Sequence, residues 1–249
     1  MGSKFFTVKF FVNVLIAVQA LLCINSAMAV ETFNQFDVGR WRDGTNHGEW
    51  TARYDGYGRV GIKQTKSGNK MLYQRPMASK SLNETHASLV LSKEEYSTNE
   101  ISLRSKVVRQ LRTPVPNSWE TAWVLWNYKH DHHFYYFTLK TGGWELGKVD
   151  NAKADPNGPS CLWPEYLNCK YPGAQRYLAT GSSPTTKVGK WDRIRVMQEG
   201  NLITVYAAGK KVTEYRDTNN PYYEGRVGLY NEDASVLFDK IDINSPELL

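Results

Sequence analysis

Short runs in which hydrophobic and polar residues alternate extend over most of the chain, and turn residues separate them. Alternation with a period of two predicts strands with one buried face. Glycine, asparagine and proline gather between the runs, and no stretch carries a convincing amphipathic helical stripe. The pattern predicts an all-β sandwich or barrel. The predicted strands cover residues 57–64, 69–75, 87–91, 99–112, 120–129, 134–140, 144–149, 191–198, 202–207, 211–215, 226–230 and 236–243.

The first 29 residues differ from the rest and are predicted to be a signal peptide. Lys4 and Lys9 give a basic start, residues 10–24 are almost continuously apolar, and Ala27 and Ala29 precede a cleavage site before Val30. The apolar run is shorter than the roughly 20 residues of a spanning helix, and an uncleaved anchor is the alternative. No later stretch could cross a bilayer. We therefore expect residues 30–249 to form a single secreted domain, extracellular or periplasmic, without a membrane span.

Cysteine usage fits export. Cys23 leaves with the predicted signal peptide, so the mature chain keeps Cys161 and Cys169. A closely spaced pair in an oxidising compartment is typical of a disulfide, and two cysteines alone make a poor zinc site. We expect the bridge to staple an irregular loop over residues 150–172. That loop either carries binding residues or is an insertion without a role.

Charge and aromatic content narrow the range of ligands. The formal net charge is +6, the predicted signal peptide contributes two of these charges, and no block of lysine and arginine follows. This mild, dispersed excess argues against a nucleic-acid partner. The chain has eight tryptophans and fifteen tyrosines. A β core uses many such rings, and saccharide-binding surfaces use the same residue types.

The last third of the chain resembles a known group of folds. Its order is a Trp-led strand, a Gly-Asn hairpin, a Gly-Lys turn, a Gly-x-Val-Gly-Leu strand and a final Phe-Asp strand. The segments are Trp191-Asp-Arg-Ile-Arg-Val, Glu199-Gly-Asn-Leu-Ile-Thr-Val-Tyr, Gly209-Lys-Lys-Val, Gly225-Arg-Val-Gly-Leu-Tyr and Phe238-Asp-Lys-Ile-Asp-Ile. They resemble the closing half of concanavalin A-like jelly rolls, which include laminin-G-like modules, family-16-type glucanases and the keto-disaccharide hydrolase family. The resemblance covers residues 191–243 well and 30–149 more loosely.

This resemblance implies a two-sheet antiparallel jelly-roll sandwich, and it implies activity only weakly because such folds host many functions. The Glu-x-Asp-x-x-Glu motif of family-16 glucanases is absent from the sequence. The arginine- and glutamine-centred motifs of alginate-lyase jelly rolls are absent too, so neither activity is carried over. The leading hypothesis is a secreted protein that binds a polysaccharide or oligosaccharide.

The richest cluster of candidate ligand-binding residues lies on the predicted strands 120–129, 134–140 and 144–149. Aromatic rings stack on the C–H faces of sugars, and charged side chains hydrogen-bond to the hydroxyl groups. Alternation places Glu120 with Ala122, Val124 and Trp126 on one face and Trp123 with Leu125 on the other, without saying which face is inward. The alternative is that these rings pack the core. The candidates are Arg104, Trp123, Trp126, Tyr136, Lys140, Trp144 and Lys148.

Cleavage of a glycan is the second hypothesis. A glycoside hydrolase needs two carboxyl groups roughly 5–9.5 Å apart, one of them with a raised pKa, and Glu120 and Glu145 are the best pair on adjacent strands. A polysaccharide lyase is the less favoured enzyme. It needs a base and a cation beside the substrate's carboxylate. The residues that could serve are Tyr136, His133, Arg104, Arg109 and Lys140.

A calcium-stabilised adhesion module without a sugar site is the third hypothesis. The resemblance implies a structural Ca²⁺ between the N-terminal segment and the last strand, with Asp239 as a ligand and Asp37 as its partner. The alternative is that Asp239 is an ordinary exposed strand residue. The run from His130 to His133 also suggests a metal, but it falls between two predicted strands and is better explained as a polar turn.

Overall fold

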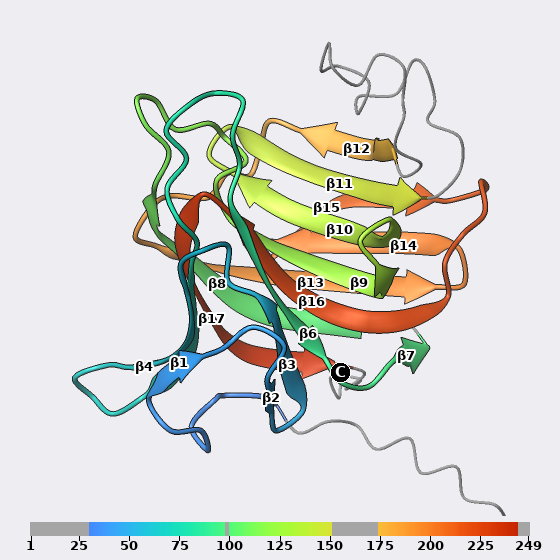
Figure 1. Ribbon diagram of the computed structural model, residues 1–249. Helices are drawn as coiled ribbons and strands as arrows, with labels where there is room; N and C mark the ends of the chain where they lie inside the picture. Colours follow the sequence, from blue (N-terminus) through green and yellow to red (C-terminus); the bar gives the residue numbers. More distant parts are fainter. Residues whose placement is uncertain (1–29, 98–99, 151–173, 244–249) are drawn as a thin grey trace, which may run out of the picture.

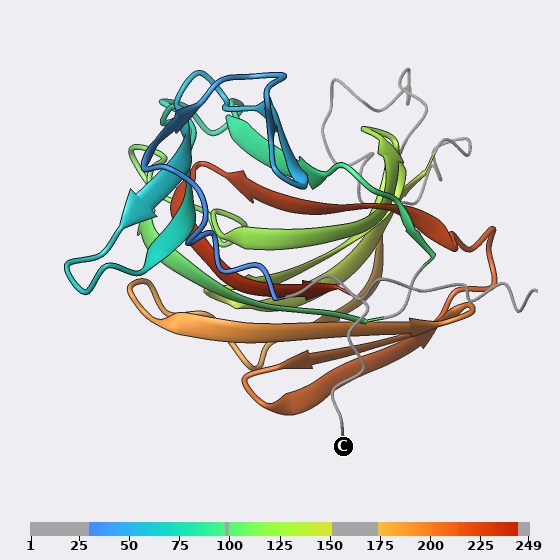
Figure 2. The ribbon, with the colours of Figure 1, turned by 90° about the horizontal axis from the view of Figure 1, so that it is seen from below.

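The computed structural model describes residues 30–97, 100–150 and 174–243, which form seventeen strands in two antiparallel sheets and no helix. The two sheets face each other as layers (Figures 1 and 2). The eight-stranded sheet has the order β1 (Gly39–Trp41), β4 (Arg59–Gln64), β5 (Lys70–Arg75), β17 (Ala234–Ile243), β8 (Glu100–Gln110), β13 (Trp191–Glu199), β14 (Leu202–Ala207) and β15 (Lys210–Arg216).

The nine-stranded sheet faces the viewer in Figure 1. Its order is β12 (Ala174–Gly181), β11 (Gly143–Asp150), β10 (His133–Lys140), β9 (Ala122–His130), β16 (Glu224–Glu232), β6 (Ala87–Ser92), β3 (Trp50–Tyr54) and β2 (Asn46–His47), and β7 (Tyr96–Ser97) pairs with β16 off this path. The prediction of an all-β, two-sheet antiparallel jelly-roll sandwich is confirmed.

The core lies between the sheets, and strand alternation decides which rings enter it. On β9 the side chains of Ala122, Val124 and Trp126 point into the core, whereas Trp123 and Leu125 belong to a separate apolar cluster on the other face. The two sets are those that the period of two predicts. The structure shows which of the two sets faces the core, which the sequence did not decide.

All twelve predicted strands are present, with ends displaced by a few residues at most. The prediction omitted β1, β2, β3, β7 and β12. Four of these have five residues or fewer, too short for alternation to stand out. The eight-residue β12 follows directly on the irregular segment of the sequence.

The start of the described chain is fastened to its last strand. The backbone N–H of Glu31 donates to the carbonyl of Ile241 at 2.7 Å, and the N–H of Ile241 donates back at 2.9 Å. The buried Glu31 carboxylate also accepts a hydrogen bond from the Trp50 indole at 3.1 Å. This bridge places the two ends of the described domain side by side.

Two predictions concern residues outside those described. The predicted signal peptide, residues 1–29, and the predicted disulfide between Cys161 and Cys169 both lie there. Within residues 30–97, 100–150 and 174–243 there is no helix long and apolar enough to span a membrane.

Candidate functional site

Aromatic side chains cover the outer face of the nine-stranded sheet and surround a pocket of about 170 Å³. We call this the aromatic pocket. It is lined by Tyr54, Leu89, Trp123, Leu125, Tyr128, Asp131, Phe134, Tyr136, Val149, Gln175, Tyr230 and Glu232. The lining comes from β3, β6, β9, β10, β11, β12 and β16, so neighbouring strands of one sheet assemble it, together with Asp131 from the β9–β10 turn.

Ring packing gives the pocket a firm floor. The Trp123 ring lies 4.9 Å from that of Tyr136 and 5.6 Å from that of Tyr230, centroid to centroid. These three residues stand on β9, β10 and β16, where Tyr230 is directly opposite Trp123. Tyr128 and Phe134 stack at 5.7 Å at the end where β9 turns into β10. Such rings offer apolar faces to the C–H groups of a sugar.

Glu232, at the end of β16, is the pocket carboxyl with the most unusual surroundings. It is half-buried, and its Oε1 accepts a hydrogen bond from the Tyr230 hydroxyl at 2.8 Å. Burial raises the pKa of Glu232 to about 7, and the charges of Asp233 and Glu145 act in the same direction. The Tyr230 hydrogen bond and the charge of Arg112 oppose this increase in pKa. A carboxyl group with such a pKa can exchange a proton near neutral pH.

Glu145 is a second carboxylate at the pocket, but its oxygens are occupied. It is fully buried on β11 and accepts hydrogen bonds from the Tyr136 hydroxyl at 2.6 Å, the Trp119 indole at 3.0 Å and the Lys140 ammonium at 2.8 Å. Gln175 donates to the Tyr136 oxygen at 2.7 Å. Glu145 therefore fixes the positions of the Tyr136 ring and of Lys140.

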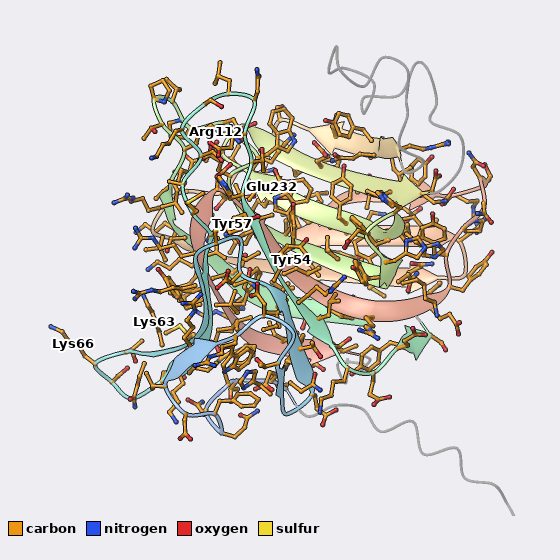
Figure 3. All side chains as sticks on the ribbon, in the orientation of Figure 1. Tyr54, Tyr57, Lys63, Lys66, Arg112 and Glu232 are labelled. Atoms are coloured by element: carbon orange, nitrogen blue, oxygen red, sulfur yellow. The ribbon has the colours of Figure 1, made fainter. Side chains whose placement is uncertain are left out.

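Tyrosine hydroxyls supply hydrogen-bond donors around the pocket. Burial raises the pKa of Tyr54, with the charge of Asp131 next in importance, so the Tyr54 hydroxyl keeps its proton. Among the residues that the structure describes, the Tyr54 hydroxyl makes no hydrogen bond. Figure 3 shows Tyr54 and Glu232, which come from two strands of the same sheet. Tyr128, in contrast, donates to Asp131 at 2.6 Å.

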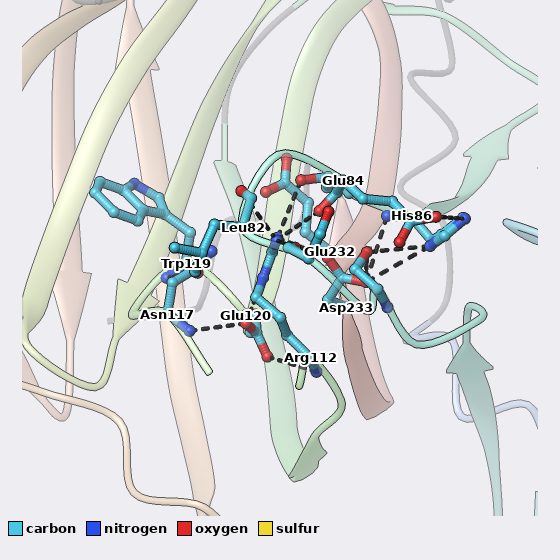
Figure 4. Close-up of polar contacts among 12 residues, drawn as sticks. Leu82, Glu84, His86, Arg112, Asn117, Trp119, Glu120, Glu232 and Asp233 are labelled. Atoms are coloured by element: carbon cyan, nitrogen blue, oxygen red, sulfur yellow. Dashed lines mark hydrogen bonds and ion pairs between the residues drawn. The ribbon is translucent and has the colours of Figure 1, made fainter. Parts of the chain in front are cut away.

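A buried ion-pair network centred on Arg112 lies beside Glu232 (Figure 4). The Arg112 guanidinium contacts Glu120 Oε1 at 3.0 Å and Asp233 Oδ2 at 2.8 Å. It also donates to the backbone carbonyl of Ser81 at 2.8 Å. Arg112 thereby joins the loop after β8, the loop before β6 and the turn between β16 and β17. This network positions the chain directly after Glu232.

The structure brings together some of the residues that the sequence singled out. Trp123 and Tyr136 line the aromatic pocket, and Lys140 and Glu145 adjoin them. Glu120 instead pairs with Arg112, so the two predicted acids, Glu120 and Glu145, are held by different partners.

The other predicted ligand-binding residues lie elsewhere. Trp126 and Trp144 are buried in the core between the sheets. Lys148 is buried there too, in an ion pair with Asp217 at 2.8 Å. Arg104 stands on β8 of the other sheet, over the ring of Trp191. These four residues are therefore not part of the aromatic pocket.

The residues predicted from the sequence do not include Tyr54, Gln175, Tyr230 or Glu232. The predicted strand 226–230 stops two residues before Glu232, and β3 and β12 were not predicted as strands. The usable signal was the alternation of Gly228, Tyr230 and Glu232, which places a glycine, a ring and an acid on one face.

The surroundings of Asp239 do not suit calcium. Asp239 is buried and Asp37 is exposed. Burial raises the pKa of Asp239, and the charged side chains acting on it are the cations Arg104 and Lys240. No group of three or more candidate ligand side chains converges anywhere in the described part of the chain. Calcium stays a prediction that these contacts do not favour. The His130–His133 segment forms the end of β9, a turn and the start of β10.

Residues 29–244 match the family model described as a 3-keto-alpha-glucoside-1,2-lyase-like domain. The chain therefore belongs to this carbohydrate-related family of jelly rolls. None of the curated proteins is similar enough in sequence to count as a match.

Solved structures show the same fold at low identity. The carbohydrate-binding module CBM66 from Bacillus subtilis has a TM-score of 0.51 and 16% identity, over 78% of this chain and 93% of that one. A β-glucanase from Bacillus licheniformis has a TM-score of 0.51 and 11% identity, over 89% and 100%. A Bacillus subtilis protein of unknown function with a galectin-like fold has a TM-score of 0.50 and 9% identity, over 83% and 96%.

Proposed function

We propose that this protein binds a saccharide in the aromatic pocket and cleaves it by proton abstraction beside a carbonyl group, with Glu232 as the base. The observation that carries the proposal is the half-buried Glu232 carboxyl, whose pKa is raised to about 7 in a pocket lined by aromatic rings. The description of the matching family supports the proposed substrate class, a glucoside oxidised at C3. We further propose, from the character of residues 1–29, that the protein acts outside the cytoplasm.

The reaction is an elimination across C1 and C2 of the sugar. Glu232 removes the proton from C2, which is acidic because it adjoins the C3 carbonyl, and the electron pair moves onto the carbonyl oxygen as an enolate. When the carbonyl re-forms, the C1–C2 double bond appears and the C1–oxygen bond breaks. The departing oxygen takes a proton, and Glu232 holds the proton from C2. General-base catalysis of this kind contributes about 10²–10⁴-fold to the rate.

The tyrosines fit the remaining roles in this reaction. Tyr54 keeps its proton, and its hydroxyl has no hydrogen-bond partner among the described residues, so it can donate to the enolate oxygen or to the departing oxygen. The Trp123 ring lines the pocket and packs on the buried Tyr136 ring beneath it, so Trp123 is the ring that would contact the sugar. Glu145 and its donors keep the Tyr136 ring fixed, because the Tyr136 hydroxyl is bonded to Glu145.

Hydrolysis by two carboxyl groups has less support. It requires one carboxylate to act as nucleophile or to activate water while the other donates a proton. Glu145 is fully buried behind its four donors and presents no free oxygen to a ligand. The third pocket acid, Asp131, lies on the β9–β10 turn and accepts a hydrogen bond from the Tyr128 hydroxyl. Glu232, with its raised pKa, together with phenol donors suits an elimination better than a hydrolysis.

The test is incubation of the purified mature protein with a 3-keto-glucoside, followed by ultraviolet absorbance of the unsaturated ketone and chromatography of the released alcohol. We expect Glu232→Gln to lower kcat by at least about 100-fold. The matched control is Glu224→Gln, an exposed acid at the other end of β16, which should keep full activity.

The pH dependence identifies the role of Glu232. A base must be deprotonated, so kcat/KM should increase with pH through about 7 and then level off. A rate that decreases through pH 7 would assign Glu232 as an acid instead. Binding of the keto-glucoside without any product would contradict cleavage and leave a binding protein.

A further inference from the structure

We propose that the outer face of the eight-stranded sheet carries a second binding site, for the carboxylates of an acidic polysaccharide built of uronic acids. This cationic patch is defined by Arg104, Trp191, Arg193, Arg195, Tyr206 and Lys240. All of them except Trp191 line an open cavity of about 520 Å³. The proposed substrate pocket lies on the other sheet, so this site does not rest on the proposed function.

The strand register places the patch cations side by side. Arg193 on β13 is directly opposite Arg104 on β8, and Arg195 is opposite both Ser102 on β8 and Tyr206 on β14. Directly opposed residues of antiparallel strands point to the same face, and like charges in that relation repel each other. A bound anion would remove this repulsion.

Acids neutralise the patch only in part. Arg195 is ion-paired with Glu100. Among residues 30–97, 100–150 and 174–243, no acid lies within ion-pair distance of Arg104, Arg193 or Lys240. Asp239 is opposite Arg104 on β17, but it is buried. Asp242 is opposite Ser102 on the same face. The four cations Arg104, Arg193, Arg195 and Lys240 therefore face three carboxyl groups, those of Glu100, Asp239 and Asp242, and the patch keeps one positive charge in excess.

Aromatic rings hold the guanidinium groups and give the patch its preference for sugars. The Arg104 guanidinium lies 4.8 Å from the centre of the Trp191 ring, and that of Arg195 lies 5.4 Å from the centre of the Tyr206 ring. Stacking restricts a flexible side chain and leaves its N–H edge free to form paired hydrogen bonds with a carboxylate. The half-buried rings beside the cations can contact the C–H face of the same sugar. A uronate residue presents both a carboxylate for the guanidinium groups and a C–H face for the rings.

The experiment is isothermal titration calorimetry of the mature protein with polygalacturonate, with dextran as a neutral polysaccharide and polyphosphate as a non-sugar polyanion. We expect the double variant Arg104→Gln, Arg193→Gln to bind polygalacturonate at least about tenfold more weakly. Binding of dextran, if measurable, should not change.

The chain offers a matched control on the same sheet. Arg59 and Arg75 are also directly opposite each other, both are exposed, and neither stacks on a ring among the described residues. Their double glutamine variant removes the same charge and should bind polygalacturonate within about twofold of the wild type.

Three outcomes would overturn the proposal. The first is no binding of polygalacturonate by the wild-type protein. The second is an equal loss in both double variants, which would indicate only long-range attraction to a basic protein. The third is polyphosphate binding as tight as polygalacturonate binding with the same dependence on Arg104 and Arg193, which would indicate a general polyanion site.

Discussion

At the scale of single residues, Glu232 should reduce the stability of the protein at neutral pH. Its pKa is raised to about 7 in the folded protein, whereas an unfolded glutamate has a pKa of about 4.3. The folded state therefore binds this proton more tightly, and the associated stability, present below about pH 4.3, is lost as pH increases to about 7. Above pH 7 the folded state contains a carboxylate that burial disfavours.

The variant Glu232→Gln removes this pH dependence. We expect it to be more stable than the wild type by about 1–3 kcal/mol at pH 8 and to differ little at pH 4.5. Urea denaturation at the two pH values measures the difference, with Glu224→Gln as the control. If the Glu232→Gln gain in stability were the same at both pH values, titration of Glu232 would not be its cause.

Residue-level chemistry was only partly accessible from the sequence. Alternation separated Trp123 from Trp126 correctly, but both sets on β9 are apolar, so nothing in the pattern says which set faces the core. Lys148 is buried because Asp217 and two backbone carbonyls accept its ammonium protons. Those partners are about 70 positions away along the chain, and no local pattern predicts such a contact.

At the scale of elements, the absence of a side chain on β11 makes room for the pocket floor. Gly147 is directly opposite Tyr136, and a Cβ placed on Gly147 would lie 2.0 Å from the Tyr136 ring. The Tyr136 ring therefore packs directly against the backbone of Gly147. Any larger residue must displace it and pull its hydroxyl away from Glu145.

We expect Gly147→Ala to destabilise the protein by about 1–3 kcal/mol and to reduce saccharide binding, because the Tyr136 ring must move. Gly142→Ala is the control on the neighbouring turn, where the nearest atom to the added Cβ is Ser118 Cβ at 3.9 Å. Chemical denaturation and calorimetry measure the two effects. Equal stability of the two alanine variants would show that the Tyr136 ring adjusts without cost.

Element prediction succeeded at most of the long, alternating strands. It missed the short strands β1, β2, β3 and β7 and the eight-residue β12. Trp50 on β3 is fully buried, but β3 has only five residues and β2 has two. These strands exist because β6 provides a partner for β3 and β3 for β2. Pairing between distant segments, which a single sequence does not show, stabilises them.

At the scale of the whole molecule, the Arg112 network joins three distant segments, and its loss should be severe. Arg112→Leu leaves the buried carboxylates of Glu120 and Asp233 without a cation. Removing one partner of a buried ion pair costs about 3–5 kcal/mol. The melting temperature of Arg112→Leu should therefore decrease markedly, whereas Arg42→Leu at an exposed turn should change it little.

A triple variant separates charge from packing in this network. Adding Glu120→Gln and Asp233→Asn to Arg112→Leu removes the unpaired carboxylates and should recover part of the lost stability. No recovery would mean that the hydrogen bonds of Arg112 to the loop carbonyls, rather than its ion pairs, dominate.

The backbone hydrogen bonds between Glu31 and Ile241 hold the two ends of the described chain close together. A short linker could join the two ends of the described chain, and new ends could be opened at the tight turn around Gly200, where an added Cβ would meet no atom within 4 Å. Such a circular permutant should fold to the same sandwich. For the same reason, a tether at either end would attach the molecule at one point, beside the end of β17.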